Sequence, residues 1–198
     1  MTHETTEHPV SGVVLHTRAE VDLAIGHWLL AATESPTRSR MEWDKYGVTM
    51  LKTGTLFSAI AMSTRLVHAA AGASDPGAVD SYLERALIGG PVIHDPDRCR
   101  YYALVPASGG RPWEMSRGRD ITPLGRGAYV GVPRPGLTAK DAAPGIPYWS
   151  VHMPSMAELC LPAAVAALVE VGQYELARRA QAQAAEEQAL PLPKGRGR

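Results

Sequence analysis

Two carboxylates, Asp95 and Asp97, stand two residues apart in the stretch His94-Asp95-Pro96-Asp97. Hard divalent cations such as Mg²⁺ bind oxygen ligands, and two carboxylates at this spacing can reach one ion if they project from the same side of a strand. The intervening proline instead favours a turn, in which an aspartate accepts hydrogen bonds from its own backbone. Asp95 and Asp97 are therefore candidate Mg²⁺ ligands, and the turn is the alternative.

A basic and aromatic stretch, Arg98 to Tyr102, follows directly. Guanidinium groups bind phosphate through paired hydrogen bonds, and tyrosine rings stack on bases. If the chain is extended, Arg100 and Tyr102 share one face of the strand and Tyr101 lies on the other. Such a face could bind a nucleotide or nucleic acid, although a half-buried strand with a polar outer face explains the same alternation.

A second candidate contact is the turn Lys52-Thr53-Gly54-Thr55, which joins two apolar runs. A turn rich in glycine and threonine can present backbone N–H groups and hydroxyls to a ligand, here with a lysine beside them. It can equally be an ordinary loop. The full set of candidate ligand-binding residues is Lys52, Thr53, Thr55, Arg98, Arg100, Tyr102, Arg126 and Tyr129.

The formal net charge is zero, but the charges are unevenly distributed. Residues 98–140 contain eight arginines and lysines against two acidic residues, Glu114 and Asp120, so this segment carries +6 and the remainder −6. A local positive field attracts nucleic acid or a phosphorylated ligand. Arginines solvated on loops would give the same count.

Several common catalytic and nucleotide-binding patterns are absent from the sequence: GxxxxGK[ST], GxGxxG after a strand, HExxH and GxSxG. Cys99 and Cys160 belong to no CxxC or metal-ligand pattern, so we expect two free thiols in a reducing cytoplasm. The polar N-terminus lacks signal-peptide character, and no apolar run reaches the ~18–20 residues that cross a bilayer. These features predict a soluble, cytoplasmic protein with no membrane partner.

Local patterns predict an α+β fold, with a mostly antiparallel sheet flanked by helices and a C-terminal helical hairpin. We expect a first helix that starts at the capping box Thr17–Glu20 and ends before Pro36. A second helix is expected over Thr64–Ala71, with Ser63 as its N-cap, and a third from Asp75-Pro76 to Gly89-Gly90. The expected strands are Val48–Leu51 with Leu56–Met62 as a first pair, Pro91–His94 with Tyr101–Val105 as a hairpin, then Ala128–Val132 and Tyr148–His152. Residues 106–125 and 133–147 are expected to be loops, and the helical hairpin begins at Ser155–Glu158 and breaks at Gly172.

The domain organisation is expected to be a single domain over residues 12–189, with a sheet-containing core (12–154) and the helical hairpin (155–189). Residues 1–11 are expected to form a disordered tail and residues 190–198 a disordered basic tail. Only four of the 20 basic residues are lysine, and alanine, glycine and proline are abundant. This bias is typical of a GC-rich genome, such as that of an actinobacterium.

Three segments carry a resemblance to a known family: W..YGVTML..GTLFSAI from Trp43, GGPVIHDPDRCRYYALVPA from Gly89, and LGRGAYVGVPRP from Leu124. Together they resemble short actinobacterial proteins related to the N-terminal domain of bifunctional DNA primase-polymerases. The resemblance implies an archaeo-eukaryotic primase type of fold and binding of a nucleotide or DNA. That superfamily uses paired acids on a strand, a Ser/Gly-x-His on the next strand, and a third acid.

The motifs of this chain depart from that pattern. The pair Asp95 and Asp97 lies in an expected turn, Tyr101 and Tyr102 stand where the histidine strand would be, and no third acid can be placed. The resemblance therefore implies a catalytically reduced relative without polymerase activity. The leading hypothesis is a nucleotide- or nucleic-acid-binding regulatory protein that needs no cofactor.

Two alternatives remain open from the sequence. The first is a Mg²⁺-dependent enzyme of nucleotidyl or phosphoryl transfer that uses Asp95 and Asp97. The second is a protein–protein interaction module, in which the helical hairpin and exposed tryptophans (Trp113 and Trp149) form the docking surface.

Overall fold

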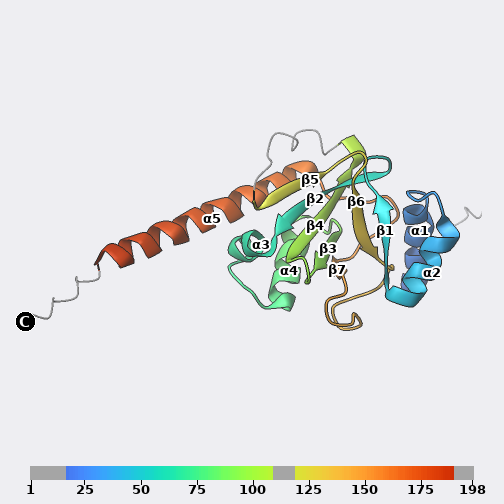
Figure 1. Ribbon diagram of the computed structural model, residues 1–198, viewed down its shortest axis with the longest axis horizontal. Coiled ribbons are helices and arrows are strands. Elements are labelled where there is room, and N and C mark those ends of the chain that lie inside the picture. Colours follow the sequence, from blue (N-terminus) through green and yellow to red (C-terminus); the bar gives the residue numbers. More distant parts are fainter. Residues whose placement is uncertain (1–16, 109–118, 190–198) are drawn as a thin grey trace, which may run out of the picture.

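A five-stranded antiparallel sheet forms the centre of the computed structural model, which describes residues 17–108 and 119–189. Within these residues its strand order is β5-β2-β4-β3-β7, and a separate antiparallel pair, β1-β6, lies beside it (Figure 1). The strands are β1 (Val48–Lys52), β2 (Phe57–Ser63), β3 (Val92–Asp95), β4 (Arg100–Pro106), β5 (Ile121–Leu124), β6 (Tyr129–Pro133) and β7 (Tyr148–Val151).

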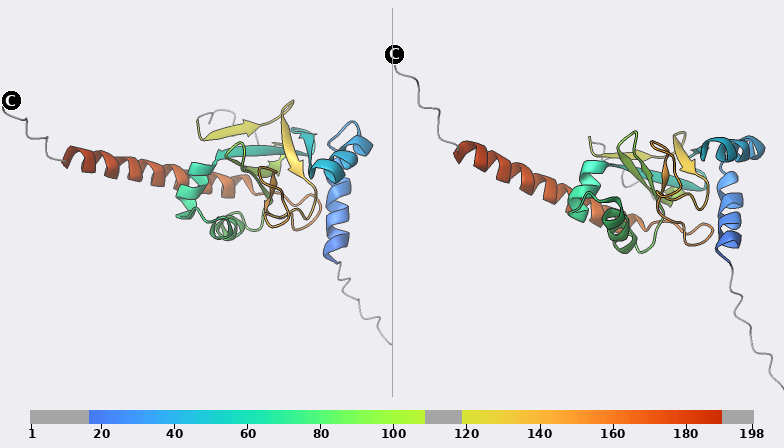
Figure 2. Two further views of the ribbon diagram at one scale, coloured as in Figure 1. Left: turned by 60° about the horizontal axis from the view of Figure 1, so that its bottom comes forward. Right: turned by 90° about the horizontal axis from the view of Figure 1, so that it is seen from below.

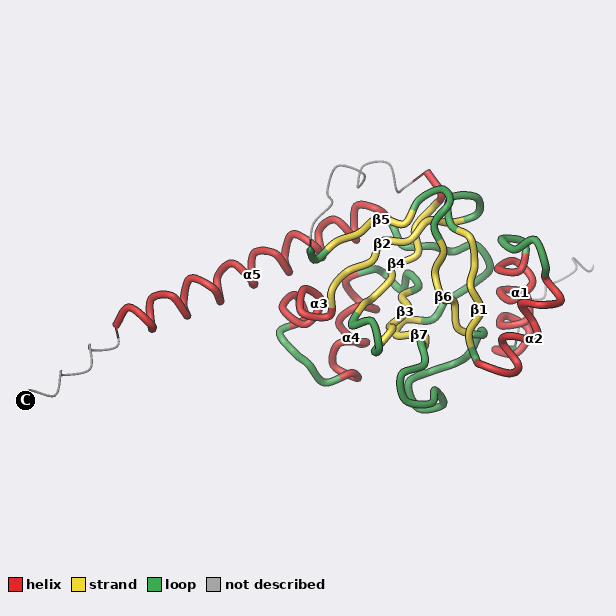
Figure 3. Tube along the Cα trace, viewed as in Figure 1, coloured by secondary structure: helices red, strands yellow, loops and turns green. Residues whose placement is uncertain are grey.

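Helices and the β1-β6 pair cover the two faces of this sheet (Figures 1 and 3). The helices are α1 (Arg18–Leu30), α2 (Pro36–Tyr46), α3 (Thr64–Ala71), α4 (Pro76–Ala86) and α5 (Pro162–Ala189). Side chains alternate along β4, because Tyr101 packs in the core beneath α3, α4 and α5, whereas Tyr102 packs in the core beneath α1 and β1-β6. The expected α+β class, with a mostly antiparallel sheet flanked by helices, is thus confirmed.

The helix caps lie where the sequence predicts them. Thr17 and Glu20 form the expected capping box, and the Ser63 hydroxyl accepts the backbone N–H of Leu66. Asp75 accepts the N–H of Ala78, with proline at the first helical position. The β3–β4 hairpin is also confirmed, with Asp95 opposite Arg100. These features depend on neighbouring residues alone, so the sequence could predict them.

The prediction that Val48–Leu51 and Leu56–Met62 pair with each other is wrong. Both runs are strands, but β1 pairs with β6, and β2 lies between β4 and β5. Gly54, at φ +89°, lets the connection pass tightly over another loop, because a Cβ there would lie 2.4 Å from the Cα of Arg126. The turn therefore carries the chain from one sheet to the other.

Two elements fall in segments that were expected to be irregular. The helix α2 begins with Pro36 at its first position, where proline is well tolerated, so this proline both follows one helix and starts the next. The strand β5 lies inside the expected loop 106–125 and contains Pro123. It is an edge strand of the five-stranded sheet, and proline is compatible with an edge because one side needs no backbone donor.

The C-terminal region is one helix, α5, rather than the predicted hairpin. Ser155 and Glu158 form a side-chain hydrogen bond of 2.8 Å in a turn, and the helix begins only at Pro162. Gly172 does not break it. The far half of α5 extends away from the sheet as a lone helix (Figure 2).

The predicted tails at 1–11 and 190–198, and Trp113, lie outside the described residues. Within the described part of the chain, no helix combines the length and apolar character needed to cross a membrane.

Candidate functional site

The strand register separates the predicted ligand-binding residues into two groups. Phe57 lies opposite Pro106 at one end of the β2–β4 ladder, and Ser63 lies opposite Arg100 at the other. Six residues of strand separate these ends by roughly 20 Å. The turn that begins at Lys52 leads into β2 at Phe57, which is the end of the ladder far from Arg100. The structure therefore does not bring this turn together with Arg98 and Arg100.

The first group gathers Lys52, Thr53, Thr55, Arg126 and Tyr129. Lys52 and Tyr129 are directly opposite in the β1–β6 ladder. Thr53 is fully buried, and its hydroxyl donates to the carbonyl oxygen of Gly125 at 2.6 Å. Thr55 and Arg126 are exposed. Thr53 thus holds two loops together, whereas the other four side chains remain accessible to a ligand.

A groove of about 340 Å³ lies beside Lys52 and Tyr129, between them and the start of α2. Its lining contains two cations, Arg38 and Lys52, and two acids, Glu34 and Glu42. Arg38 forms an ion pair of 2.9 Å with Glu42. Hydrogen bonds from Thr49 and Arg38 lower the pKa of Glu42, so it stays ionised. The charges balance, and this groove has no preference for an anion.

The second group surrounds the β3–β4 turn. The Asp95 carboxylate is 7% exposed and accepts the backbone N–H of Arg98 at 3.1 Å, which is the turn role that the proline predicted. Asp97 is exposed and lies close against Gly145. No group of three or more His, Cys, Asp or Glu side chains converges in the described ranges as a metal site requires. The two carboxylates fit a turn better than Mg²⁺.

Tyr102 packs in the core rather than on a binding face. It is 7% exposed and lies in the cluster with Ala61 and Leu104. Burial raises the pKa of its phenol, and the nearby charge of Asp95 adds to this effect. Its ring is not available for stacking on a base unless the core opens.

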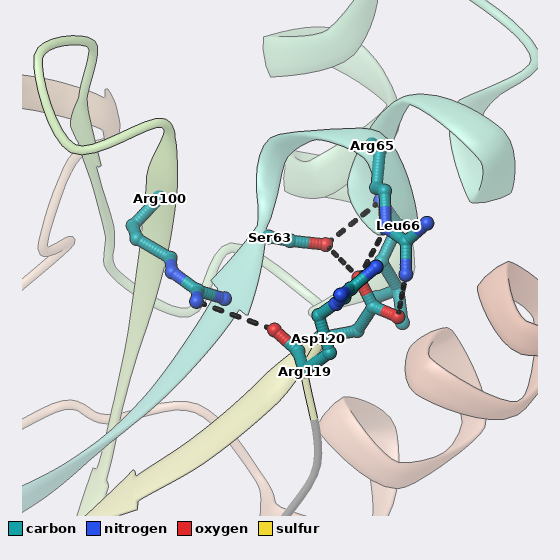
Figure 4. Close-up of polar contacts among 6 residues, drawn as sticks. All are labelled: Ser63, Arg65, Leu66, Arg100, Arg119 and Asp120. Carbon is teal, nitrogen blue, oxygen red and sulfur yellow. Dashed lines mark hydrogen bonds and ion pairs between the residues drawn. The ribbon is translucent and has the colours of Figure 1, made fainter.

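Arg100 lies beside an ionic cluster at the end of β2 and β5 (Figure 4). Arg65 donates two hydrogen bonds of 2.6 Å to Asp120, and the Ser63 hydroxyl donates to the same carboxylate at 2.5 Å. The hydrogen bonds from Arg65, and to a smaller extent the one from Ser63, hold the pKa of Asp120 below its usual value. Arg100 donates to the carbonyl oxygen of Arg119 at 3.3 Å, and its Nη1 is buried without a partner among the described residues.

A second groove, of about 490 Å³, runs between this cluster and α5. We call it the basic groove; among its described lining residues are Arg65, Asp120, Gln173, Leu176, Arg179 and Gln183. Asp120 is the one acid in that lining and is already paired with Arg65. Arg100 and Arg119 lie beside Asp120 (Figure 4), so the surroundings of the groove are positive.

Sequence reasoning missed Arg65 and Arg179 because neither belongs to the basic segment 98–140. Arg65 is on α3 and Arg179 on α5, and only the packing of these two helices places them beside Asp120. The pair Arg178-Arg179 in an otherwise alanine-rich helix was the available signal.

A buried cluster of histidine and tyrosine side chains was also missed. The imidazole of His94 stacks on Tyr101 with ring centroids 4.1 Å apart, and its Nδ1 is 2.9 Å from the hydroxyl of Tyr148. Burial, and then the charge of His68, lowers the pKa of His94 to about 4. Burial raises the pKa of both tyrosines. These groups are therefore neutral near pH 7.

Both cysteines are free, as expected. Cys160 is buried, and burial raises the pKa of its thiol to about 12, so it is not a nucleophile at neutral pH. Cys99 is exposed in the β3–β4 turn.

Comparison of the chain with protein-family models, with curated proteins and with solved structures finds no match. The resemblance to primase-polymerase domains therefore stays a prediction.

Proposed function

We propose that this protein binds a nucleotide or a nucleic-acid strand in the basic groove and acts as a regulatory binding protein without polymerase activity. One observation carries the proposal. Arg65 and Arg179, which are far apart in the sequence, line one groove that holds a single carboxylate among its described lining residues, and Arg100 and Arg119 lie beside that carboxylate.

The charge of this cluster is not balanced internally. Asp120 makes a two-point contact with Arg65 and also interacts with the charge of Arg100, but it is one carboxylate beside four arginines. Among the described residues, neither Arg100 nor Arg179 forms an ion pair. A phosphate group supplies the missing negative charge and accepts paired hydrogen bonds from guanidinium.

The shape of the groove favours an extended ligand. Its α5 wall runs from Gln173 to Gln183, which corresponds to roughly 15 Å of helix. The wall presents two glutamines, one arginine and the small or apolar side chains of Leu176, Ala177 and Ala180, which can contact a backbone without reading a particular base. We therefore expect binding with little sequence preference.

The experiment is a fluorescence anisotropy titration of a labelled single-stranded oligonucleotide at several salt concentrations, with ATP as competitor. Arg179→Gln is compared with Arg178→Gln, because Arg178 is the neighbouring arginine that pairs with Glu175 at 2.8 Å and does not line the groove. We expect Arg179→Gln to weaken binding and to reduce the salt slope by about 0.7, the value for one phosphate contact with a single strand. Arg178→Gln should leave both unchanged.

The proposal is overturned if neither the oligonucleotide nor ATP binds, or if the two variants lose affinity equally. Equal losses would indicate a diffuse electrostatic effect of α5 rather than a contact within the groove.

A further inference from the structure

A third groove, of about 370 Å³, lies between α4, the end of β7 and the start of α1. We call it the α4 groove. Its charged and polar lining includes Arg18, Asp80, Glu84, Ser150 and His152. None of these residues lines the basic groove, so an inference about this groove does not depend on nucleotide binding.

One wall of the α4 groove carries two acids without a cation. Asp80 and Glu84 are four residues apart on α4, so both side chains lie on the same face of the helix. Within the described residues, neither acid forms an ion pair. The hydroxyl of Ser150 donates to Asp80, and this is a neutral partner. Burial, and to a smaller extent Asp75, raises the pKa of Asp80.

The rest of the lining includes hydrogen-bond donors from α1 and from the end of β7. Arg18 is half exposed, and one nitrogen of its guanidinium lies 3.0 Å from Asp22. A guanidinium has five N–H donors, so most of them remain for another acceptor. His152 is half-buried beside Arg18, and burial, followed by the charge of Arg18, lowers its pKa. It is thus a neutral imidazole at pH 7 and can donate one hydrogen bond.

We propose that the α4 groove binds a free α-amino acid. The ammonium group lies between Asp80 and Glu84, and the carboxylate accepts hydrogen bonds from Arg18 and His152. Bound in this way, the ammonium lies beside two carboxylates and the carboxylate of the ligand lies beside a guanidinium, so each pole meets a group of opposite charge. A simple anion would face the two acids, and a simple cation would face Arg18.

The size of the groove agrees with a small ligand, because 370 Å³ is near the lower end of the usual range for small-molecule sites. Ser81 and Gly89 also border the groove, and Gly89 has no side chain that would narrow it. The remaining volume can accommodate the side chain of the amino acid.

The test is thermal unfolding of the full chain with each of the twenty L-amino acids in turn. A ligand present at ten times its dissociation constant raises the folding equilibrium constant about 11-fold, which raises Tm by about 3–6 °C for a domain of this size. The N-acetyl and the amide derivatives of the stabilising amino acid each lack one charged pole. Neither derivative should raise Tm.

Two variants locate the binding. Asp80→Asn and Arg18→Gln should each abolish the Tm shift, whereas Arg85→Gln, an exposed arginine on α4 outside the groove, should retain it. Arg18 is half exposed, so Arg18→Gln should fold normally. This variant can therefore still test the proposal if Asp80→Asn does not fold. The proposal is overturned if no amino acid raises Tm, if the N-acetyl derivative does so equally, or if Arg18→Gln responds like the original chain.

Discussion

Gly172 of α5 lies directly against Leu66 of α3. A Cβ at position 172 would be 2.7 Å from the carbonyl oxygen of Leu66 and 2.9 Å from its Cγ. The two helices can approach this closely only because residue 172 lacks a side chain. The close approach holds α5 against α3, and residues of both helices line the basic groove.

We predict that Gly172→Ala destabilises the protein although alanine favours helices. The gain in helix propensity is about 1 kcal/mol, whereas forcing a methyl group into a packed contact costs about 1–3 kcal/mol and more when the obstacle is backbone. The net loss in the free energy of unfolding should be about 1–2 kcal/mol. Urea denaturation followed by circular dichroism measures it.

Gly77→Ala provides the matched control for this substitution. Gly77 is in the first turn of α4, and its new Cβ would meet only the Asp75 carboxylate, at an ordinary 3.4 Å. We expect this variant to be neutral or more stable by up to about 1 kcal/mol. If both variants behave alike, the close contact between Gly172 and Leu66 does not determine stability.

The buried position of His94 predicts a loss of stability in mild acid. Its pKa is about 4 in the folded chain, below the usual 6.5, so the unfolded chain binds the additional proton between these values. Stability is therefore full above pH 6.5 and falls as the pH decreases towards 4. The full shift corresponds to about 3 kcal/mol, which solvent screening of the partly exposed ring reduces to about 1–2 kcal/mol.

His94→Gln tests this prediction because glutamine does not titrate. Its free energy of unfolding, measured by urea denaturation from pH 4 to 7, should vary less with pH than that of the original chain. His68 and His152 also have lowered pKa values because of burial, so part of the slope should remain. An unchanged slope in His94→Gln would contradict the prediction.

The sequence predicted those features that depend on neighbouring residues. The caps at Thr17, Ser63 and Asp75 and the β3–β4 hairpin are local, so they could be identified without a partner. The pairing of β1 with β6 joins residues about 80 positions apart, and nothing in either strand specifies the other. Gly172 illustrates the same limit, since its role appears only when Leu66 is beside it.

The site was predicted only in part for the same reason. Arg100 was identified from the basic run that contains it, whereas Arg65 and Arg179 reach the groove through helix packing. The prediction that Tyr101 and Tyr102 lie on opposite faces of the strand is confirmed. Alternation does not tell which face of a strand is covered, and in this sheet both faces are covered.

We predict that substitution of Asp120 increases the affinity of the protein for an oligonucleotide. Asp120→Asn removes the negative charge from the lining of the basic groove and releases Arg65, so the oligonucleotide should bind more tightly and with a steeper salt dependence. The Arg65 side chain of this ion pair is more than half exposed, so loss of the pair should change stability little. Glu175→Gln, on α5 outside the groove, removes the same charge and should change affinity less. Equal tightening in both would indicate that net charge alone acts.

Substitution of Thr53 tests whether the turn Lys52-Thr53-Gly54-Thr55 stabilises the fold or contacts a ligand. Its hydroxyl donates to the carbonyl oxygen of Gly125, and Thr53→Val leaves that acceptor with one bond fewer. We expect a loss of about 1–2 kcal/mol in the free energy of unfolding, measured by urea denaturation, with oligonucleotide affinity unchanged. Thr53→Ser keeps the hydroxyl and should retain most of the stability. If Thr53→Val instead keeps its stability and loses oligonucleotide affinity, the turn contacts the ligand, and the binding surface extends along the roughly 20 Å that separates it from Arg100.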